Sequence, residues 1–161
     1  AHQLAQVNIA RLRAPFDDPS VRGFVDGFDR LARLADRSPG FVWRLVDPSG
    51  HHATVDARTV VNVSVWETYQ ALHDFVYRTA HGEYTRRRKR WFEPIGGPTT
   101  ALWWIPVADR PTLDQALARL EHLRRWGSSP TAFSLLRQFV PTGRPVPRRH
   151  GGQAVDNRPA R

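Results

Sequence analysis

Residues 60–92, VVNVSVWETYQALHDFVYRTAHGEYTRRRKRWF, predict the strand and the helix around which the fold is built. In the first part, up to Trp66, valines alternate with other side chains. Alternation with a period of two residues in a β-branched run is typical of a half-buried strand. Thr68 is a candidate N-cap, and after it apolar residues recur every three or four positions, as on one face of a helix. The stretch therefore predicts a strand that leads directly into a long helix.

The elements predicted on either side complete the plan. Strand periodicity covers residues 3–12, 41–46 and 100–107, and helical periodicity covers residues 18–38 and 112–126. The order β-α-β-β-α-β, followed by an extra C-terminal helix, is the split βαβ plan. The sequence therefore predicts an α+β, ferredoxin-like domain in which two helices cover one face of a four-stranded antiparallel sheet.

The C-terminal part of the chain is different in composition. Residues 131–140 are apolar enough for either a short helix or a strand. From Pro141 onward the chain is rich in proline, glycine and arginine and has little to bury, which indicates disorder. We expect one domain over residues 1–140 and a disordered basic tail over residues 141–161.

Composition excludes several classes of protein. The 161 residues contain no cysteine, which excludes disulfide scaffolds, thiolate metal sites and a cysteine nucleophile and fits a cytoplasmic location. No segment approaches the roughly 20 apolar residues that a membrane span needs, so no membrane partner is expected. The formal net charge is +9, but arginine in place of lysine is also what a GC-rich coding sequence produces.

Large apolar residues occupy both faces of the predicted strands. Trp66, Trp103 and Trp104 cannot all point toward the two helices that the split βαβ plan places on one face. An uncovered sheet face that carries tryptophan typically marks an interface. We therefore expect a homodimer that packs sheet against sheet.

Several motifs together resemble a known family. They are LAQVNIARLRAPFDDP, SPGFVWRL, VVNVSVWET, FVYRTAH followed by RRRKRWFEP, and ALWWIP with the DRPT after it. They cover residues 3–127 and resemble domain of unknown function 3291, which is similar to the dimeric α/β-barrel superfamily of antibiotic-biosynthesis monooxygenases. The resemblance implies a dimeric α/β barrel. It implies no single activity, because that superfamily includes cofactor-independent oxygenases, heme-degrading enzymes and isomerases.

The heme-degrading branch of that superfamily implies three positions in this chain. Asn8 resembles its asparagine on the first strand, and His81 resembles its histidine on the second long helix. The place of its helical tryptophan is taken by Phe75, which lacks the indole N–H, and the spacing from Phe75 to His81 is shorter than in that branch. This departure argues against heme-degrading chemistry and leaves room for a ligand.

Three residues are candidates for catalysis. His81 is the candidate base near neutral pH, or the axial ligand if heme is bound. Its angular position opposite Leu72 is equally consistent with a solvent-facing histidine. Arg44 is a candidate to hold a carboxylate or enolate oxygen, and Asn8 to donate a hydrogen bond to a substrate carbonyl. Both are also consistent with satisfied polar residues at a dimer interface.

A second group of polar and aromatic residues is predicted to bind the substrate. These candidates are Phe75, Tyr77, Tyr84, Arg88, Asn62 and Trp66. Aromatic side chains suit a flat ligand, although such residues more often belong to the core, which is the interpretation favoured for Trp66. Core or interface packing is also favoured for Asn62.

Other functional classes find no support. Residues 86–90 are all basic, but five consecutive helical residues spread around the whole circumference, so nucleic acid is not expected as a partner. The histidines show no metal-ligand spacing, and the motifs HExxH, GxSxG and a glycine-rich phosphate loop do not occur. No metal is expected, apart from heme iron at His81 in one alternative.

These observations leave three hypotheses. The first is a monooxygenase-like enzyme that acts, without a nucleotide cofactor, on a hydrophobic aromatic or polyketide-like small molecule, as in natural-product biosynthesis. The second is a heme-binding protein with His81 as axial ligand. The third is a non-catalytic ligand-binding or structural dimer.

Overall fold

The structure of the chain is a computed structural model that describes residues 1–48, 50–51, 53–80 and 83–148. Of residues 80, 83–85 and 88 it describes the backbone alone. The elements in chain order are β1 (His2–Leu12), η1 (Pro19–Val21), α1 (Arg22–Asp36), β2 (Phe41–Arg44), β3 (Ala53–Thr54), β4 (Thr59–Trp66), α2 (Tyr69–Ala80), α3 (Glu83–Trp91), β5 (Phe92–Glu93), β6 (Thr100–Pro106) and α4 (Leu113–Trp126).

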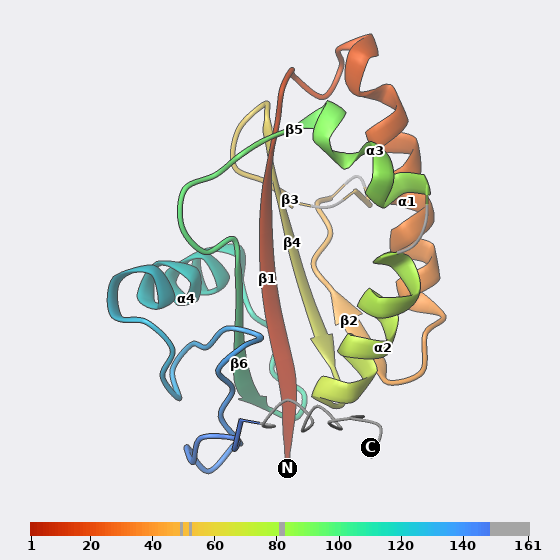
Figure 1. The fold of residues 1–161 in the computed structure, drawn as a ribbon. Coiled ribbons are helices and arrows are strands. Elements are labelled where there is room, and N and C mark those ends of the chain that lie inside the picture. The colour runs from red at the N-terminus through yellow and green to blue at the C-terminus, as the bar shows by residue number, and fades with distance from the viewer. Residues whose placement is uncertain (49, 52, 81–82, 149–161) are drawn as a thin grey trace, which may run out of the picture.

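The sheet is antiparallel, and its long strands lie in the spatial order β2, β4, β1, β6 (Figure 1). β1 and β4 form the central pair, with eight residues in register from Leu4 opposite Trp66 to Arg11 opposite Thr59. The short strand β3 pairs with the start of β4, and the short strand β5 pairs with the end of β1. This topology confirms the predicted α+β, ferredoxin-like fold.

Alternation along the central strands divides the core into two sides. On one face of the sheet, Ala5 and Val7 of β1 and Val61, Val63 and Val65 of β4 are fully buried. On the opposite face, Leu4 and Trp66 pack with Leu72 of α2. The helices α1 and α2 cover this second face, as Figure 1 shows to the right of the strands. The predicted strand over residues 60–66 and its alternation between two faces are thereby confirmed. The expectation that it is half-buried is wrong, because helices cover both faces of β4 and all its residues except Asn62 are buried.

The expectation of an uncovered sheet face is wrong. α4 packs its apolar stripe, formed by Ala116, Leu120 and Leu123, onto the face opposite α1 and α2 (Figure 1). Trp103 is only 2% exposed beneath it, with the Arg119 guanidinium 5.9 Å from its ring. The reason is that the C-terminal helix turns back onto its own sheet. The homodimer predicted through this face stays a prediction.

The helix predicted after Thr68 is described as two helices. α2 ends at Ala80 and α3 begins at Glu83, while residues 81–82 lie outside the described part. α3 packs on α1, where Trp91 contacts the ring of Phe24 at a centroid distance of 6.3 Å. No helix of the described residues is long and apolar enough to cross a membrane.

The segment after α4 runs along the outer edge of β6. Phe133 forms a two-bond bridge with Leu102, and the indole N–H of Trp104 donates to the carbonyl oxygen of Phe139 at 2.7 Å. Residues 131–140 are therefore neither a helix nor a full strand. The chain then folds back, since Val146 donates its backbone N–H to Gln138 at 2.8 Å. Residues 141–148 of the predicted tail are thus attached to the domain, and residues 149–161 lie outside the described part.

Candidate functional site

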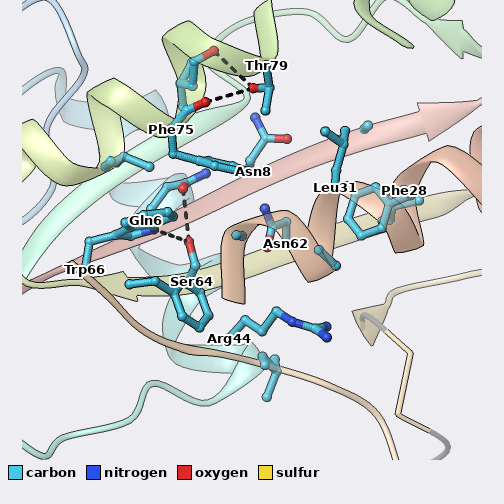
Figure 2. Close-up of a pocket in the computed structure, with 18 of the residues that line it drawn as sticks. Gln6, Asn8, Phe28, Leu31, Arg44, Asn62, Ser64, Trp66, Phe75 and Thr79 are labelled. Carbon is cyan, nitrogen blue, oxygen red and sulfur yellow. Dashed lines mark hydrogen bonds between the residues drawn. The ribbon is translucent and has the colours of Figure 1, made fainter. Parts of the chain in front are cut away.

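A partly open cavity of about 290 Å³ lies between the sheet and the helices α1 and α2 (Figure 2). Its floor comes from even-numbered positions of β1 and β4, because these side chains point away from α4. The polar residues that line it are Gln6, Asn8, Arg44, Asn62, Ser64 and Thr79. The apolar walls include Phe24, Phe28, Leu31, Phe41, Trp66, Leu72, Phe75 and Phe92. The cavity is thus an apolar hollow with a polar strip across its floor.

The polar strip follows from the register of the two central strands. Asn8 lies directly opposite Asn62, and Gln6 lies directly opposite Ser64. Directly opposed residues of an antiparallel pair have Cβ atoms about 5 Å apart, so the four side chains form one cluster. Its members are half-buried except Ser64, which is buried.

One half of the strip is satisfied internally. The indole N–H of Trp66 donates to Ser64 Oγ at 3.0 Å, and Ser64 Oγ donates to Gln6 Oε1 at 3.1 Å (Figure 2). Trp66 is 1% exposed, so its N–H needs this partner. This chain of hydrogen bonds holds the indole ring in place as one wall of the cavity.

The other half has hydrogen-bonding capacity to spare. The side-chain amide of Asn8 donates to Thr100 Oγ1 at 2.7 Å, which leaves the carbonyl oxygen of that amide without a partner in the described part. Asn62 makes no side-chain hydrogen bond within the described residues. A half-buried amide without a protein partner is favourable only if water or a ligand satisfies it. Asn62 therefore offers both a donor and an acceptor to whatever occupies the cavity.

Arg44 enters the cavity from β2 and is paired with α1. Its Nε donates to Asp36 Oδ1 at 2.8 Å, and its Nη2 donates to Asp36 Oδ2 at 3.4 Å. Arg44 faces the cavity because it lies opposite Ser64 in the β2–β4 register. The site therefore contains a cation whose charge is already balanced.

Aromatic rings shape the end of the cavity near Trp66. Phe75 lies at a centroid distance of 5.3 Å from Trp66 with an interplanar angle of 30°, and Phe41 meets the same indole edge-on at 5.3 Å. Such surfaces suit a flat ligand, because ring systems attract one another in offset and edge-to-face geometries. The described walls thus favour an aromatic or otherwise planar molecule.

The structure brings together five of the residues predicted for the site. Asn8, Arg44, Asn62, Trp66 and Phe75 all line the cavity. For Trp66, burial in the core and a place in the cavity wall hold at the same time, since it is 1% exposed and lines the cavity.

Tyr77 is not brought into the cavity. It is 63% exposed on the outer side of α2, where its ring stacks near that of His73. The cavity-facing positions of α2 are Leu72, Phe75, Val76 and Thr79, and position 77 falls on the far side of a helix with 3.6 residues per turn. His81 lies outside the described residues, as do the side chains of Tyr84 and Arg88.

Sequence reasoning did not select several lining residues. Gln6 was detectable, because it lies two positions before Asn8 and therefore shares its face. Phe24, Phe28 and Leu31 belong to the apolar stripe of α1, and such a stripe looks the same whether it meets a packed core or a hollow. No sequence signal separates these two cases.

The donor set indicates what the described site can do. None of the described lining residues is a carboxylate, histidine, cysteine, tyrosine or lysine, so this part of the site supplies hydrogen bonds and shape. No group of three potential metal ligands occurs among the described residues. For heme, the described lining residues offer no axial ligand, and a volume near that of two benzene-sized cavities of roughly 150 Å³ would not enclose a four-pyrrole macrocycle. The described residues therefore do not fit heme.

Fold and site together define an α+β protein of the ferredoxin-like class with an amide-lined cavity between sheet and helices. The chain belongs to the family described as domain of unknown function DUF3291, which matches residues 3–149. No curated protein matches the chain.

The solved structures that are similar to this chain include the following two. One is SnoaB, described as a cofactor-independent oxygenase from Streptomyces nogalater, with 19% identity and a TM-score of 0.44 over 70% of this chain and 98% of that chain. The other is an asparagine-to-alanine mutant of SnoaB, with 18% identity, the same coverage and a TM-score of 0.44. At this identity and TM-score, no residue role and no activity transfers to this chain.

Proposed function

We propose that the cavity binds a hydrophobic aromatic or polyketide-like small molecule through a carbonyl or hydroxyl group. The observation that carries the proposal is the unpartnered amide of Asn62, which lies beside Asn8 on the floor of an otherwise largely apolar hollow. The size of the ligand follows from the volume. A cavity of roughly 150 Å³ holds benzene, so 290 Å³ has room for a molecule of about two rings. Natural ligand pockets begin at about 300 Å³.

We further propose an oxygenase-like reaction that needs no nucleotide cofactor. Removal of a proton from a CH₂ group next to a carbonyl leaves an enolate, and the amide N–H groups of the cavity floor stabilise its oxygen. The enolate passes one electron to O₂, and the substrate radical and superoxide combine as a peroxide anion. This anion takes back the proton from the base and becomes a hydroperoxide. Loss of water then converts the CH₂ group into a new carbonyl. His81 is the base proposed for the first step, and natural-product biosynthesis is the context that fits such a substrate.

Binding is tested first, with 2-acetonaphthone, a two-ring aromatic ketone, by isothermal titration calorimetry. We expect Asn62→Leu to weaken binding about tenfold, because the carbonyl loses its donor while the branching and the number of heavy atoms of the side chain are kept. Gln70→Leu, an exposed position on the outer side of α2, is the matched control and should bind like wild type. Equal affinity of wild type and Asn62→Leu would remove the basis of the proposal.

Turnover is tested second, with 2-tetralone, whose CH₂ between a ring and a carbonyl is acidic. We expect oxygen uptake above the rate of spontaneous oxidation, and its loss in Asn62→Leu and in His81→Gln. A Soret band after addition of hemin that disappears in His81→Ala would instead favour the heme-binding alternative. Oxygen uptake that is equal in wild type and in both variants would contradict the mechanism.

A non-catalytic ligand-binding protein is the second candidate function. It is favoured by one observation, namely that no acid or base occurs among the described lining residues other than Arg44 with its partner Asp36. Tight binding of 2-acetonaphthone without oxygen uptake on any two-ring ketone would select this candidate.

A further inference from the structure

We propose that the ion pair between Asp36 and Arg44 makes the cavity selective for neutral carbonyl compounds over the corresponding carboxylates. This inference rests on the proposed function, since it assumes that the cavity binds a small molecule. It adds the charge class of the ligand and names Asp36 as a residue that determines specificity without lining the cavity.

Asp36 and Arg44 form a two-point ion pair. Asp36 engages Arg44 with both carboxylate oxygens, at 2.8 Å from Nε and 3.4 Å from Nη2. The side chain of Arg44 is 23% exposed and that of Asp36 is 41% exposed, so the pair lies at the edge of the cavity and within reach of solvent. A fork-to-fork arrangement of this kind fixes the direction of the guanidinium as well as its charge.

The position of Asp36 is unfavourable without this partner. Asp36 is the last residue of α1, where the helix dipole presents partial negative charge and disfavours an acidic side chain. Arg44, at the end of β2, supplies the compensating charge. The carboxylate thus depends on the arginine. It takes two of the five guanidinium N–H groups and balances the positive charge, so a second anion would meet no excess positive charge at Arg44.

The charge balance of the cavity then decides between ligands. Arg44 is the one ionised side chain among the described lining residues, and the others are amides, hydroxyls and apolar groups. With Asp36 paired to it, the net charge at the site is zero. A carboxylate that enters gives up its hydration and finds no unpaired cation, whereas a neutral carbonyl gives up less and accepts a hydrogen bond from Asn62. The chain's overall charge of +9 acts on every anion at the surface and does not supply this selectivity.

This inference changes the role predicted for Arg44. The sequence suggests a residue that holds a carboxylate or enolate oxygen. In the structure that guanidinium is held by Asp36, so negative charge that develops during a reaction is left to the amide groups of the floor. Arg44 and Asp36 together act as a charge filter, which means that they disfavour anionic ligands relative to neutral ones.

Two probes of equal size but different charge test the inference. They are 2-acetonaphthone, which is neutral, and 2-naphthoate, which carries a carboxylate at pH 7.5. Calorimetry on the full chain should show that wild type binds the ketone at least tenfold more tightly than the carboxylate. Asp36→Asn leaves the charge of Arg44 unbalanced and should shift this ratio toward 2-naphthoate by roughly two- to fivefold, the range that an exposed ion pair of up to about 1 kcal/mol gives.

The control isolates the local effect from the change in net charge. Asp26→Asn removes one carboxylate from an exposed position of the same helix and should leave the ratio as in wild type. In the double variant Asp36→Asn with Arg44→Gln, the gain for 2-naphthoate should disappear. Melting temperatures of all variants show whether each one is folded.

The outcomes separate this inference from the proposed function. If wild type binds the two probes equally well, or if Asp36→Asn and Asp26→Asn shift the ratio alike, the charge filter is overturned while ligand binding stands. If neither probe binds and Asn62→Leu has no effect on any two-ring ketone, the proposed function itself fails. The wild-type ratio needs no variant, so the test holds even if Asp36→Asn is unstable.

Discussion

Asn62 and Asn8 are the same residue type on opposite strands, yet the protein leaves them different freedom. Asn8 donates one of its two amide N–H groups to Thr100, while the side-chain amide of Asn62 makes no hydrogen bond within the described part of the chain. Such an amide destabilises the fold little while water in the cavity satisfies it. It increases the affinity for a ligand that displaces this water and forms the same hydrogen bonds. At the scale of single residues, the site is defined by the polar atoms that the fold leaves without a hydrogen-bond partner in the described part of the chain.

Gly40 shows how a single backbone position holds a cavity wall in place. It has φ = +79°, and a Cβ at this position would lie 2.5 Å from the Cβ of Ala71 in α2. Its carbonyl oxygen also accepts the backbone N–H of Glu67 at 2.8 Å, immediately before α2. The close approach of the turn before β2 to α2 therefore requires glycine.

We expect Gly40→Ala to lower the free energy of unfolding by about 2–4 kcal/mol, because strain at positive φ and a steric clash add together. Gly97→Ala is the matched control. Gly97 has φ = +77° but nothing within 4 Å of its Cβ position, so only the strain of about 1 kcal/mol should remain. Urea unfolding measures both variants. Equal losses of unfolding free energy in Gly40→Ala and Gly97→Ala would show that a Cβ at position 40 does not clash with α2.

At the scale of elements, the two faces of the sheet serve different purposes. α4 closes one face with a packed core, and α1 and α2 cover the other face but leave a hollow over the polar strip (Figure 1). The same strands therefore carry a packed core on one side and the cavity on the other. Substitutions on the two sides should separate the two properties.

We expect Leu120→Ala to cost about 2–5 kcal/mol of unfolding free energy and to leave the affinity for 2-acetonaphthone unchanged. Leu120 is 2% exposed in the α4 core and does not line the cavity. Phe28→Ala, on the cavity side of α1, should lower that affinity several-fold because it removes an aromatic wall. Urea unfolding and calorimetry measure the two quantities. A loss of affinity in folded Leu120→Ala would show that the faces are coupled.

The start of β4 depends on a carboxylate. Asp56 accepts the backbone N–H groups of Arg58 and Thr59, each at 2.8 Å, and the hydroxyl of Thr59 at 3.1 Å. The hydrogen bond from the Arg58 amide, together with those from Thr59, lowers the pKa of Asp56 below its ordinary value of 3.8. The ionised form is therefore the one that holds the turn before β4.

This lowered pKa predicts a pH dependence. Because the folded-state pKa lies below the unfolded-state value, the stabilisation is complete above that value and is lost as the pH falls below about 4. Between pH 7 and pH 3, wild type should lose more unfolding free energy than Asp56→Asn does, as measured with urea. Asp26→Asn controls for the removal of one carboxylate. Parallel losses in wild type and Asp56→Asn would contradict the assignment.

At the scale of the whole molecule, the homodimer remains a proposal that the resemblance supports. The centre of the sheet is closed by α4, so a partner would meet the sheet toward β2, where Val42, Trp43 and Leu45 are only partly buried. Their incomplete burial is a reason to expect an interface there.

We expect a molar mass of twice 18.4 kDa in sedimentation equilibrium at micromolar concentration. Trp43→Glu should shift the equilibrium toward the monomer, because a charge would be desolvated in the contact. Trp126→Glu, at a 70% exposed tryptophan at the end of α4, is the control and should leave the mass unchanged. A mass of 18.4 kDa for wild type at every concentration would end the proposal.

Local patterns in the sequence were sufficient for the elements and for the fold class. Valine alternation in residues 60–66 acts within a few residues of the chain, and so does the helix start in which Asp18 is the N-cap and Pro19 the first residue of η1. Both can therefore be recognised without tertiary contacts. The same alternation places Asn8 and Asn62 on known faces of their strands, and for Asn8 the family resemblance pointed to the same position.

Tertiary structure alone decided what those faces meet. It placed α4 on the sheet face that seemed open, left a hollow instead of a core above Asn62, and set Asp36 against Arg44. Periodicity shows which side of an element is buried. It does not show which element covers that side, or whether the space between them is filled, because both depend on how distant segments pack.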